Sequence, residues 1–177
     1  MDEVRTGTLY IVATPIGNSR DMSPRGRQIL EEADMIAAED TRRSMVLLNK
    51  LEIRNKLVSN HKFNEYGKAK FFIRAMQEGQ SVAVITDAGT PCISDPGNEL
   101  IKAAVEAGIR VVGVPGCCAA VNALAISGFD LSSFTSAGVP RKVSSWSLVM
   151  SLQRQRRQRT SSSIRKSTRS RMRLGLS

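Results

Sequence analysis

The chain has 177 residues, of which 41% are hydrophobic, and this is enough for one domain with a buried core. No apolar run reaches the roughly 18 to 20 residues of a membrane span, and the acidic start lacks the basic and apolar regions of a secretory signal, so we expect a cytoplasmic protein. Cys92, Cys117 and Cys118 show no metal-ligand or disulfide spacing and are expected to be small buried residues.

Charge divides the chain into two regions. Residues 1–140 hold 15 Lys and Arg against 16 Asp and Glu, whereas residues 141–177 hold 11 Lys and Arg and no acid. The second region is rich in Ser, Arg and Gln, a composition that cannot bury enough surface to offset chain entropy. We therefore predict a folded domain over residues 1–140 and a basic, disordered tail over residues 141–177.

The first 140 residues alternate between strand and helix patterns. Apolar, β-branched runs predict strands over residues 8–13, 35–38, 57–59, 81–86 and 110–114. Segments with helical periodicity separate these runs. This alternation is typical of an α/β fold in which helices flank a mostly parallel sheet.

Helix boundaries carry their own signals. Ser23 before Pro24, and Asp95 before Pro96, each resemble an N-cap followed by proline at the first helical position. Three glycines follow the ends of helical runs, where a left-handed residue is favoured, and these are Gly79, Gly108 and Gly128.

Five distinctive loops follow the five predicted strands. They read ATPIGN from residue 13, AEDTR from 38, NHKFNE from 60, ITDAGTPCISDPGNE from 85 and VPGCCAA from 114. Ligands of parallel α/β sheets bind beyond the carboxyl ends of the strands, so we expect all five loops to meet at one edge. No Gly-x-Gly-x-x-Gly follows the first strand and no P-loop motif is present, which argues against dinucleotide redox and P-loop chemistry.

The fourth loop predicts a rigid wall made of main chain. Gly89 lets a backbone approach a ligand without a Cβ atom, and Pro91 and Pro96 fix φ and lower the entropy lost on ordering. Peptide groups rather than side chains are then expected to recognise the ligand.

Four of these motifs, TPIGN, AEDTR, DAGTPCISDPG and VPG, in this order and at these separations, resemble the ribosomal RNA small-subunit 2′-O-methyltransferase branch of the tetrapyrrole methylase superfamily. The resemblance runs from Gly7 to Lys142. It implies a cofactor, S-adenosylmethionine, folded into a trough between two α/β domains. By position, it implies that the trough is lined by Pro15, Ala88, Gly89, Thr90, Ile93, Cys118 and Ala119.

The resemblance also implies the substrate, a cytidine ribose in small-subunit ribosomal RNA, with the RNA or the small ribosomal subunit as partner. Members of the superfamily commonly form dimers, so a homodimer is one expectation. The methyl transfer requires no metal. Candidates for phosphate contact are Arg42, Arg43, Lys62, Lys68, Lys70, Arg141 and Lys142.

The catalytic group stays open among Asp40, Arg42, His61 and Asp87. Asp40 and Arg42 have a structural alternative, because Thr41 onward reads as an ordinary helix start with acids in its first turn. His61 has one too, because a single histidine is often a structural hydrogen bonder, whereas Asp87, at a strand end, is more open. Asp95 is better explained as an N-cap than as a partner of Asp87.

The sequence departs from the family beyond Lys142. Cys117 in place of proline, Thr86 in place of serine and AGVPRK in place of the usual linker are mild changes. The second α/β domain, which should open with a Phe-Glu-Ser-Pro-His type motif, is missing. One hypothesis is a frameshift near residues 143–150, because codons for residues 163–169 exist that give this motif when read one nucleotide later.

Two other functions remain open at this point. The tail could instead be an Arg-rich RNA-binding arm on a one-domain binding module, although Trp146 is its one aromatic residue. Methylation of a tetrapyrrole shares the expected fold, but the AEDTR and TPIGN loops favour RNA. With half of the trough missing, we expect methyl transfer by this chain to be weak or undetectable.

Overall fold

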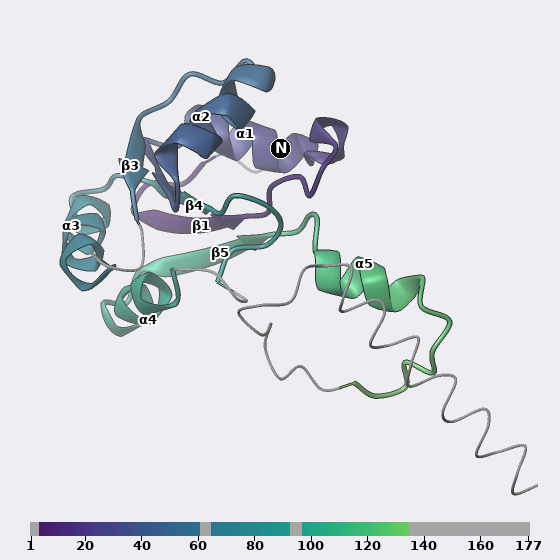
Figure 1. The fold of residues 1–177 in the computed structure, drawn as a ribbon. Coiled ribbons are helices and arrows are strands. Elements are labelled where there is room, and N and C mark those ends of the chain that lie inside the picture. The colour runs from purple at the N-terminus through teal and green to yellow at the C-terminus, as the bar shows by residue number, and fades with distance from the viewer. Residues whose placement is uncertain (1–3, 61–64, 93–96, 135–177) are drawn as a thin grey trace, which may run out of the picture. The chain divides into compact units, whose positions relative to one another are not determined.

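A computed structural model describes residues 4–60, 65–92 and 97–134 (Figure 1). The elements follow the chain as β1 (Thr8–Val12), η1 (Ser19–Asp21), α1 (Pro24–Glu32), β2 (Met35–Ala38), α2 (Thr41–Lys50), β3 (Leu57–Ser59), α3 (Glu65–Gln77), β4 (Val82–Ile85), α4 (Asn98–Glu106), β5 (Arg110–Val114) and α5 (Ala119–Ala125). The chain divides into two compact units, Met1–Ala119 and Ala120–Ser177, and the first unit contains all five of these strands. The predicted tail lies outside the described residues.

The strands form a single parallel sheet in the order β3-β2-β4-β1-β5. All four neighbouring pairs are parallel. The predicted α/β fold is therefore confirmed, and three of the five predicted strands have the observed limits. The first strand ends one residue earlier than predicted, and the fourth is one residue shorter at each end.

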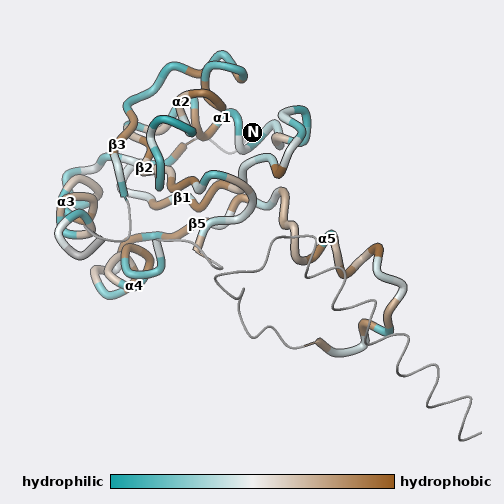
Figure 2. The backbone as a smooth tube through the Cα atoms, viewed as in Figure 1, coloured by the Kyte–Doolittle hydropathy of each residue, from teal (hydrophilic) through white to brown (hydrophobic). Residues whose placement is uncertain are grey.

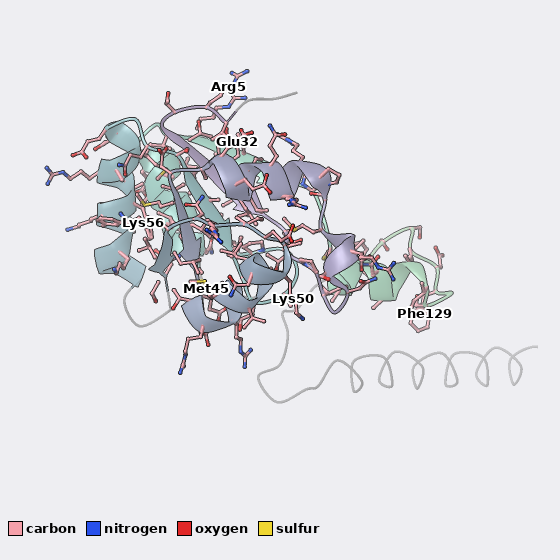
Figure 3. All side chains as sticks on the ribbon, turned by 90° about the horizontal axis from the view of Figure 1, so that it is seen from above. Arg5, Glu32, Met45, Lys50, Lys56 and Phe129 are labelled. Carbon is pink, nitrogen blue, oxygen red and sulfur yellow. The ribbon has the colours of Figure 1, made fainter. Side chains whose placement is uncertain are left out.

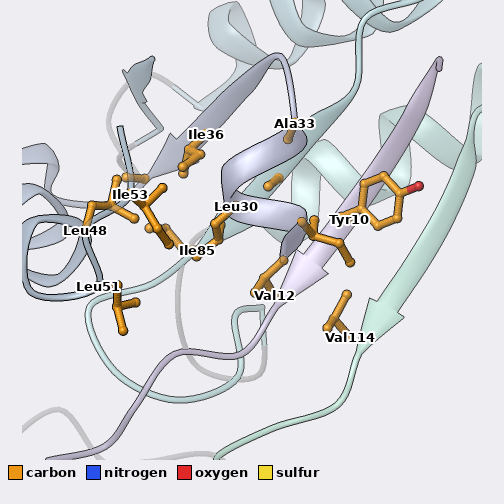
Figure 4. Packing of buried hydrophobic residues seen from close by; sticks show 13 residues of the cluster. Tyr10, Val12, Leu30, Ala33, Ile36, Leu48, Leu51, Ile53, Ile85 and Val114 are labelled. Carbon is orange, nitrogen blue, oxygen red and sulfur yellow. The ribbon is translucent and has the colours of Figure 1, made fainter. Parts of the chain in front are cut away.

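Two hydrophobic layers cover the two faces of this sheet. Side chains alternate along β1, so Tyr10 and Val12 pack with α1 and α2 (Figure 4), while Leu9 and Ile11 pack with α3 and α4. Much of the tube through the sheet is accordingly brown, the hydrophobic colour, in Figure 2. Because both faces are buried, strand register is strongly specified, and the loop positions follow from it.

The predicted helix starts are confirmed in one case and wrong in another. Ser23 Oγ accepts a hydrogen bond from the Gly26 N–H at 3.0 Å, and Pro24 opens α1. However, α4 begins at Asn98, two residues later than predicted, because Gly97 has φ 120° and interrupts the helical path before it. Asp95 lies outside the described residues.

The glycines after helices have the predicted left-handed conformation. Gly79, Gly108 and Gly128 have φ values of 94°, 70° and 66°. In the second unit, α5 ends at Ala125, three residues before Gly128 rather than directly before it, and the Ser127 hydroxyl accepts a hydrogen bond from the Phe129 N–H at 3.1 Å. Across the three described ranges, no helix is both long and apolar enough to cross a membrane.

Candidate functional site

The carboxyl ends of the five parallel strands define one edge of the sheet, which we call the rim. The registers place Ala38 beside Ser59 on β3 and beside Ile85 on β4, and Val12 beside Val114 on β5. The residues that follow these positions therefore lie side by side along the rim. This confirms that the loops described after β1, β2, β4 and β5 leave the same edge of the sheet.

A seam of main-chain hydrogen bonds joins the loops after β1 and β4. The Thr14 N–H donates to the Gly89 carbonyl at 2.9 Å, and the Gly89 N–H donates to the Thr14 carbonyl at 3.0 Å. The buried Thr14 hydroxyl also donates to the Thr86 carbonyl at 3.1 Å. Both peptide groups of Gly89 are thus engaged by the protein itself.

The loop after β5 joins the same assembly. The Thr90 hydroxyl donates to the Cys117 carbonyl at 3.0 Å. Gly116 lies so close to β1 that an added Cβ atom would be 2.8 Å from the Ala13 Cβ, a separation that side chains do not reach. Residues 13–16, 88–90 and 115–118 form what we call the main-chain half of the rim.

Left-handed backbone accounts for the composition of the loop after β4. Gly89 has φ 90° and Gly97 has φ 120°, and between them Cys92 has φ 68°. A non-glycine residue in such a conformation costs roughly 1–3 kcal/mol and persists only when its surroundings fix it. The expected burial of the three cysteines is wrong, because Cys92, Cys117 and Cys118 are each only half-buried beside this loop.

The residues predicted to line the cofactor trough fall mostly in the main-chain half. Pro15 and Gly89 are buried, Thr90 and Cys118 are half-buried, and Ala88 is exposed. Ala119, also exposed, is the first residue of α5. Ile93 lies outside the described residues.

Charged and polar side chains dominate the other part of the rim, residues 39–43, 86 and 87, which we call the side-chain half. The Thr86 hydroxyl donates to Glu39 Oε2 at 2.9 Å. Arg43 Nη1 donates to Asp87 Oδ2 at 2.8 Å and so connects α2 to the loop after β4. Within the described part of the chain, Asp87 Oδ1 is buried without a hydrogen-bond partner.

Asp40 acts as the N-cap of α2. Its Oδ1 accepts hydrogen bonds from the N–H groups of Arg42 at 2.9 Å and Arg43 at 3.4 Å. These backbone donors, the Arg42 N–H first, and the nearby guanidinium groups hold the pKa of the Asp40 carboxyl below its usual value. A carboxylate engaged in this way is poorly placed to accept a proton.

The other catalytic candidates are only partly brought together. The Arg42 side chain is 94% exposed and lies near Asp40 rather than Asp87. Arg43, which the sequence indicated only as a phosphate contact, is the residue that reaches Asp87. The pairing of Arg43 with Asp87 could have been predicted from the strand order. Arg43 follows β2 and Asp87 follows β4, and these two strands are neighbours in the sheet. His61 lies outside the described residues.

Two hollows of the structure lie away from the rim. One of about 910 Å³ is at the amino-terminal edge of the sheet, beside Arg5, Gln77 and Arg110. Another of about 580 Å³ lies between α3 and α4, beside Ile73 and Ala103. Over residues 4–60, 65–92 and 97–134, no cluster of three or more His, Cys, Asp or Glu side chains could hold a metal ion.

Comparison with solved structures places this architecture among methyltransferases. The crystal structure of uroporphyrin-III-C-methyltransferase from Thermus thermophilus aligns with a TM-score of 0.54 and 27% identity, covering 72% of this chain and 54% of that one. A structure of the native form of the enzyme from the same organism aligns with a TM-score of 0.52 and 18% identity, covering 76% and 56%, and supports the fold alone.

The chain belongs to the tetrapyrrole (corrin/porphyrin) methylases, whose family model matches residues 8–161. This match confirms the predicted superfamily and continues past Lys142, where the resemblance noted in the sequence ends.

The similar curated proteins carry the name ribosomal RNA small subunit methyltransferase I. The one from Pasteurella multocida is 50% identical over 133 residues, which are 75% of this chain and 47% of that protein. The one from Escherichia coli O157:H7 is 47% identical over 132 residues, which are 75% and 46%. The chain thus spans about half the length of the curated relatives it matches.

Proposed function

We propose that this chain is the amino-terminal part of an S-adenosylmethionine-dependent methyltransferase that acts on the ribose 2′-hydroxyl of a cytidine in small-subunit ribosomal RNA. The names of the relatives that are about 50% identical support the RNA substrate. The observation that carries the proposal is the seam between Thr14 and Gly89, which fixes one rigid wall at the rim.

The residues of the main-chain half fit an adenosyl ligand. Gly116 lets the loop after β5 pack against Ala13 and so holds the wall together, and the half-buried hydroxyl and thiol groups of Thr90 and Cys118 place no charge beside the neutral adenosine part of the cofactor. We assign the cofactor contacts to Pro15, Ala88, Gly89, Thr90, Ile93, Cys118 and Ala119. The N–H and carbonyl of Gly89 are already hydrogen-bonded to Thr14. Gly89 therefore contributes by letting the cofactor come close to the backbone, and its neighbours supply the hydrogen bonds to the cofactor.

The sulfonium of the bound cofactor supplies an activated methyl group. The task of the chain is then to hold the acceptor oxygen in line with that group, and such orientation supplies about 7–11 kcal/mol of a barrier. Asp40 is engaged as a helix cap, so Asp87 and His61 are the stronger candidates for proton acceptance, and the exposed Arg42 is a candidate for phosphate contact.

The setting of the reaction follows from the substrate. We propose a cytoplasmic protein whose partner is ribosomal RNA or the small ribosomal subunit, and a homodimer as its assembly. The basic tail from residue 141 is either a frameshifted segment or an added RNA-binding arm. An isolated 141–177 peptide with salt-dependent RNA affinity would establish the arm, and a peptide without affinity would favour the frameshift.

Tetrapyrrole methylation is the second candidate function. The structural similarity to uroporphyrin-III-C-methyltransferase favours it, but the identity of 27% there is well below the 50% shared with proteins named for ribosomal RNA. We therefore rank the RNA substrate first.

Two measurements test the proposed function. Calorimetry with S-adenosylhomocysteine should detect weak binding to the 177-residue chain, and labelled S-adenosylmethionine should transfer little or no methyl group to small ribosomal subunits. Robust turnover by this chain would contradict the expectation that a second domain is needed.

A chimera tests the substrate directly. Residues 8–142 of this chain replace the matching part of the Pasteurella multocida relative, which is 50% identical over 133 residues. The chimera should form 2′-O-methylcytidine in small-subunit RNA, detected by mass spectrometry of nucleosides. A chimera that binds the cofactor but methylates no RNA would refute the proposed acceptor.

A further inference from the structure

One face of α2 is an exposed stripe with cations at both ends. Arg42, Met45, Val46, Asn49 and Lys50 are all exposed, and their spacing of three and four residues places them on one side of the helix. The opposite side is buried through Ser44 and Leu48. Figure 3, seen from the side of α1 and α2, labels Met45 and Lys50 on this helix.

Positive charge is concentrated on this helix and the loop after it. Residues 41–56 contain Arg42, Arg43, Lys50, Arg54 and Lys56. Their one acid is Glu52, whereas the rest of residues 1–140 hold 10 Lys and Arg against 15 Asp and Glu. Helix α2 itself contains no acid. Residues 1–140 are nearly neutral as a whole, but residues 41–56 have a net charge of +4.

The exposed stripe starts at the candidate site. Helix α2 begins directly after Asp40, whose side chain caps it at the rim, and its ten residues extend about 15 Å away from the rim. The Arg42 side chain is 94% exposed, with its nearest carboxylate oxygen at 3.8 Å. Lys50 has no ion-pair partner among the described residues.

We propose that the exposed stripe of α2 binds the RNA strand next to the acceptor nucleotide. This inference rests on the proposed function for the presence of RNA at the rim. Phosphates favour the stripe because Lys and Arg release counterions when they neutralise a nucleic acid backbone. Met45 and Val46, which are 46% and 57% exposed, contact ribose and base faces between the two cationic ends. The absence of acid along α2 favours RNA over a mixed-charge protein surface.

Adding a cation to the stripe tests the proposal by a gain of affinity. Val46→Arg places a new guanidinium between Arg42 and Lys50. The matched control is Val105→Arg on α4, because Val105 is 64% exposed and the two variants have the same net charge. Binding of a labelled single-stranded RNA is measured against salt. Val46→Arg should steepen the slope of log K against log salt by about 0.7, the value for one phosphate contact on a single strand. Val105→Arg should leave the slope unchanged.

Removing cations gives the complementary test. The double variant Arg42→Gln, Lys50→Gln should lower the slope by about 1.4, at about 0.7 for each contact. Its control, Arg74→Gln with Lys102→Gln, removes two cations from α3 and α4 and should leave the slope unchanged. Since all variants keep the basic tail, differences between each variant and its control report on α2 alone.

Each outcome has a distinct meaning. RNA binding by the wild-type chain with equal slopes for each variant and its control would overturn the α2 surface while leaving the proposed function intact. A wild-type chain that binds S-adenosylhomocysteine but no RNA would overturn the RNA substrate and the surface together. If Val46→Arg instead abolished dimerisation in sedimentation and left RNA binding unchanged, a second copy of the chain would occupy the stripe, and the proposal would be wrong.

Discussion

The two halves of the rim use different chemistry. In the main-chain half, Thr14 and Gly89 exchange two backbone hydrogen bonds, and Gly116 brings the loop after β5 against Ala13. In the side-chain half, Asp40 caps α2, and Arg43 is 2.8 Å from Asp87. Backbone bonds depend on conformation and are insensitive to salt, whereas exposed ion pairs are screened by it.

The difference fits the separate tasks that we propose for the two halves. A wall of hydrogen-bonded backbone suits a ligand that must be held in one shape, because a preorganised site loses less conformational entropy on binding. Charged side chains at the head of a basic helix suit a polyanion, since they attract it over distance and tolerate variation in sequence. Substitutions in the main-chain half should therefore affect cofactor binding, and substitutions in the side-chain half should affect salt-dependent contacts.

The largest expected effect comes from adding a side chain at Gly116, where the loop after β5 packs against Ala13. Gly116→Ala puts a Cβ atom 2.8 Å from the Ala13 Cβ and should lower the free energy of unfolding by about 1–3 kcal/mol, the usual cost of overpacking. Gly113→Ala in β5 is the control, because its added Cβ atom meets nothing within 4 Å. Urea unfolding measures both, and equal stabilities would show that the close approach is unimportant.

Gly89→Ala should separate folding from ligand binding. Its φ of 90° is nearly the same as the 94° of Gly79, so Gly79→Ala should be destabilised equally, by about 1–2 kcal/mol. Only Gly89→Ala changes the main-chain half, and only this variant should weaken S-adenosylhomocysteine binding in calorimetry. Equal binding by both variants would remove Gly89 from the site.

Arg43→Met should have a smaller effect, concentrated in one loop. The Arg43 side chain is 73% exposed, so the loss of its ion pair with Asp87 should cost only about 0.2–1 kcal/mol and less at high salt. Hydrogen exchange should quicken at residues 86–92 in this variant. Arg74→Met breaks the pair with Glu78 on α3 and should not affect that loop. Unchanged exchange in Arg43→Met would show that the pair does not hold the loop.

Asp40→Asn should leave the stability of the fold nearly unchanged at neutral pH and alter it only in acid. Asparagine caps helices about as well as aspartate, so the cap remains. Because the folded pKa of Asp40 is lowered, its charge stabilises the fold above the unfolded pKa of about 3.9, and this contribution is lost as pH falls through the folded pKa. The variant should therefore lose less stability between about pH 5 and pH 2. Identical acid unfolding curves would contradict this assignment.

Sequence periodicity was sufficient to predict the strands but not the contacts between loops. The β-branched runs at β2, β3 and β5 have limits set by local composition, so their prediction needed no tertiary information. The pairing of Arg43 with Asp87 depends on β2 lying beside β4, which no local pattern encodes. The left-handed Cys92 was also missed, since cysteine gives no signal for positive φ.

Helix α4 shows a further limit. Asp95 and Pro96 have the composition of a helix start, yet Gly97 at φ 120° delays α4 until Asn98. A positive φ at Gly97 is incompatible with a helix that continues from Pro96, and an isolated proline signal cannot reveal this.

Nuclear magnetic resonance of the amide groups tests the central claim most directly. S-adenosylhomocysteine is added to the labelled 177-residue chain, and shifts of backbone N–H signals are followed. The account predicts the largest shifts at Ala88, Gly89, Thr90 and Cys118 in the main-chain half, with little change at Gly79 and Gly108 on the opposite edge. Shifts confined to the amino-terminal hollow around Arg5 and Arg110, with none at the rim, would contradict it.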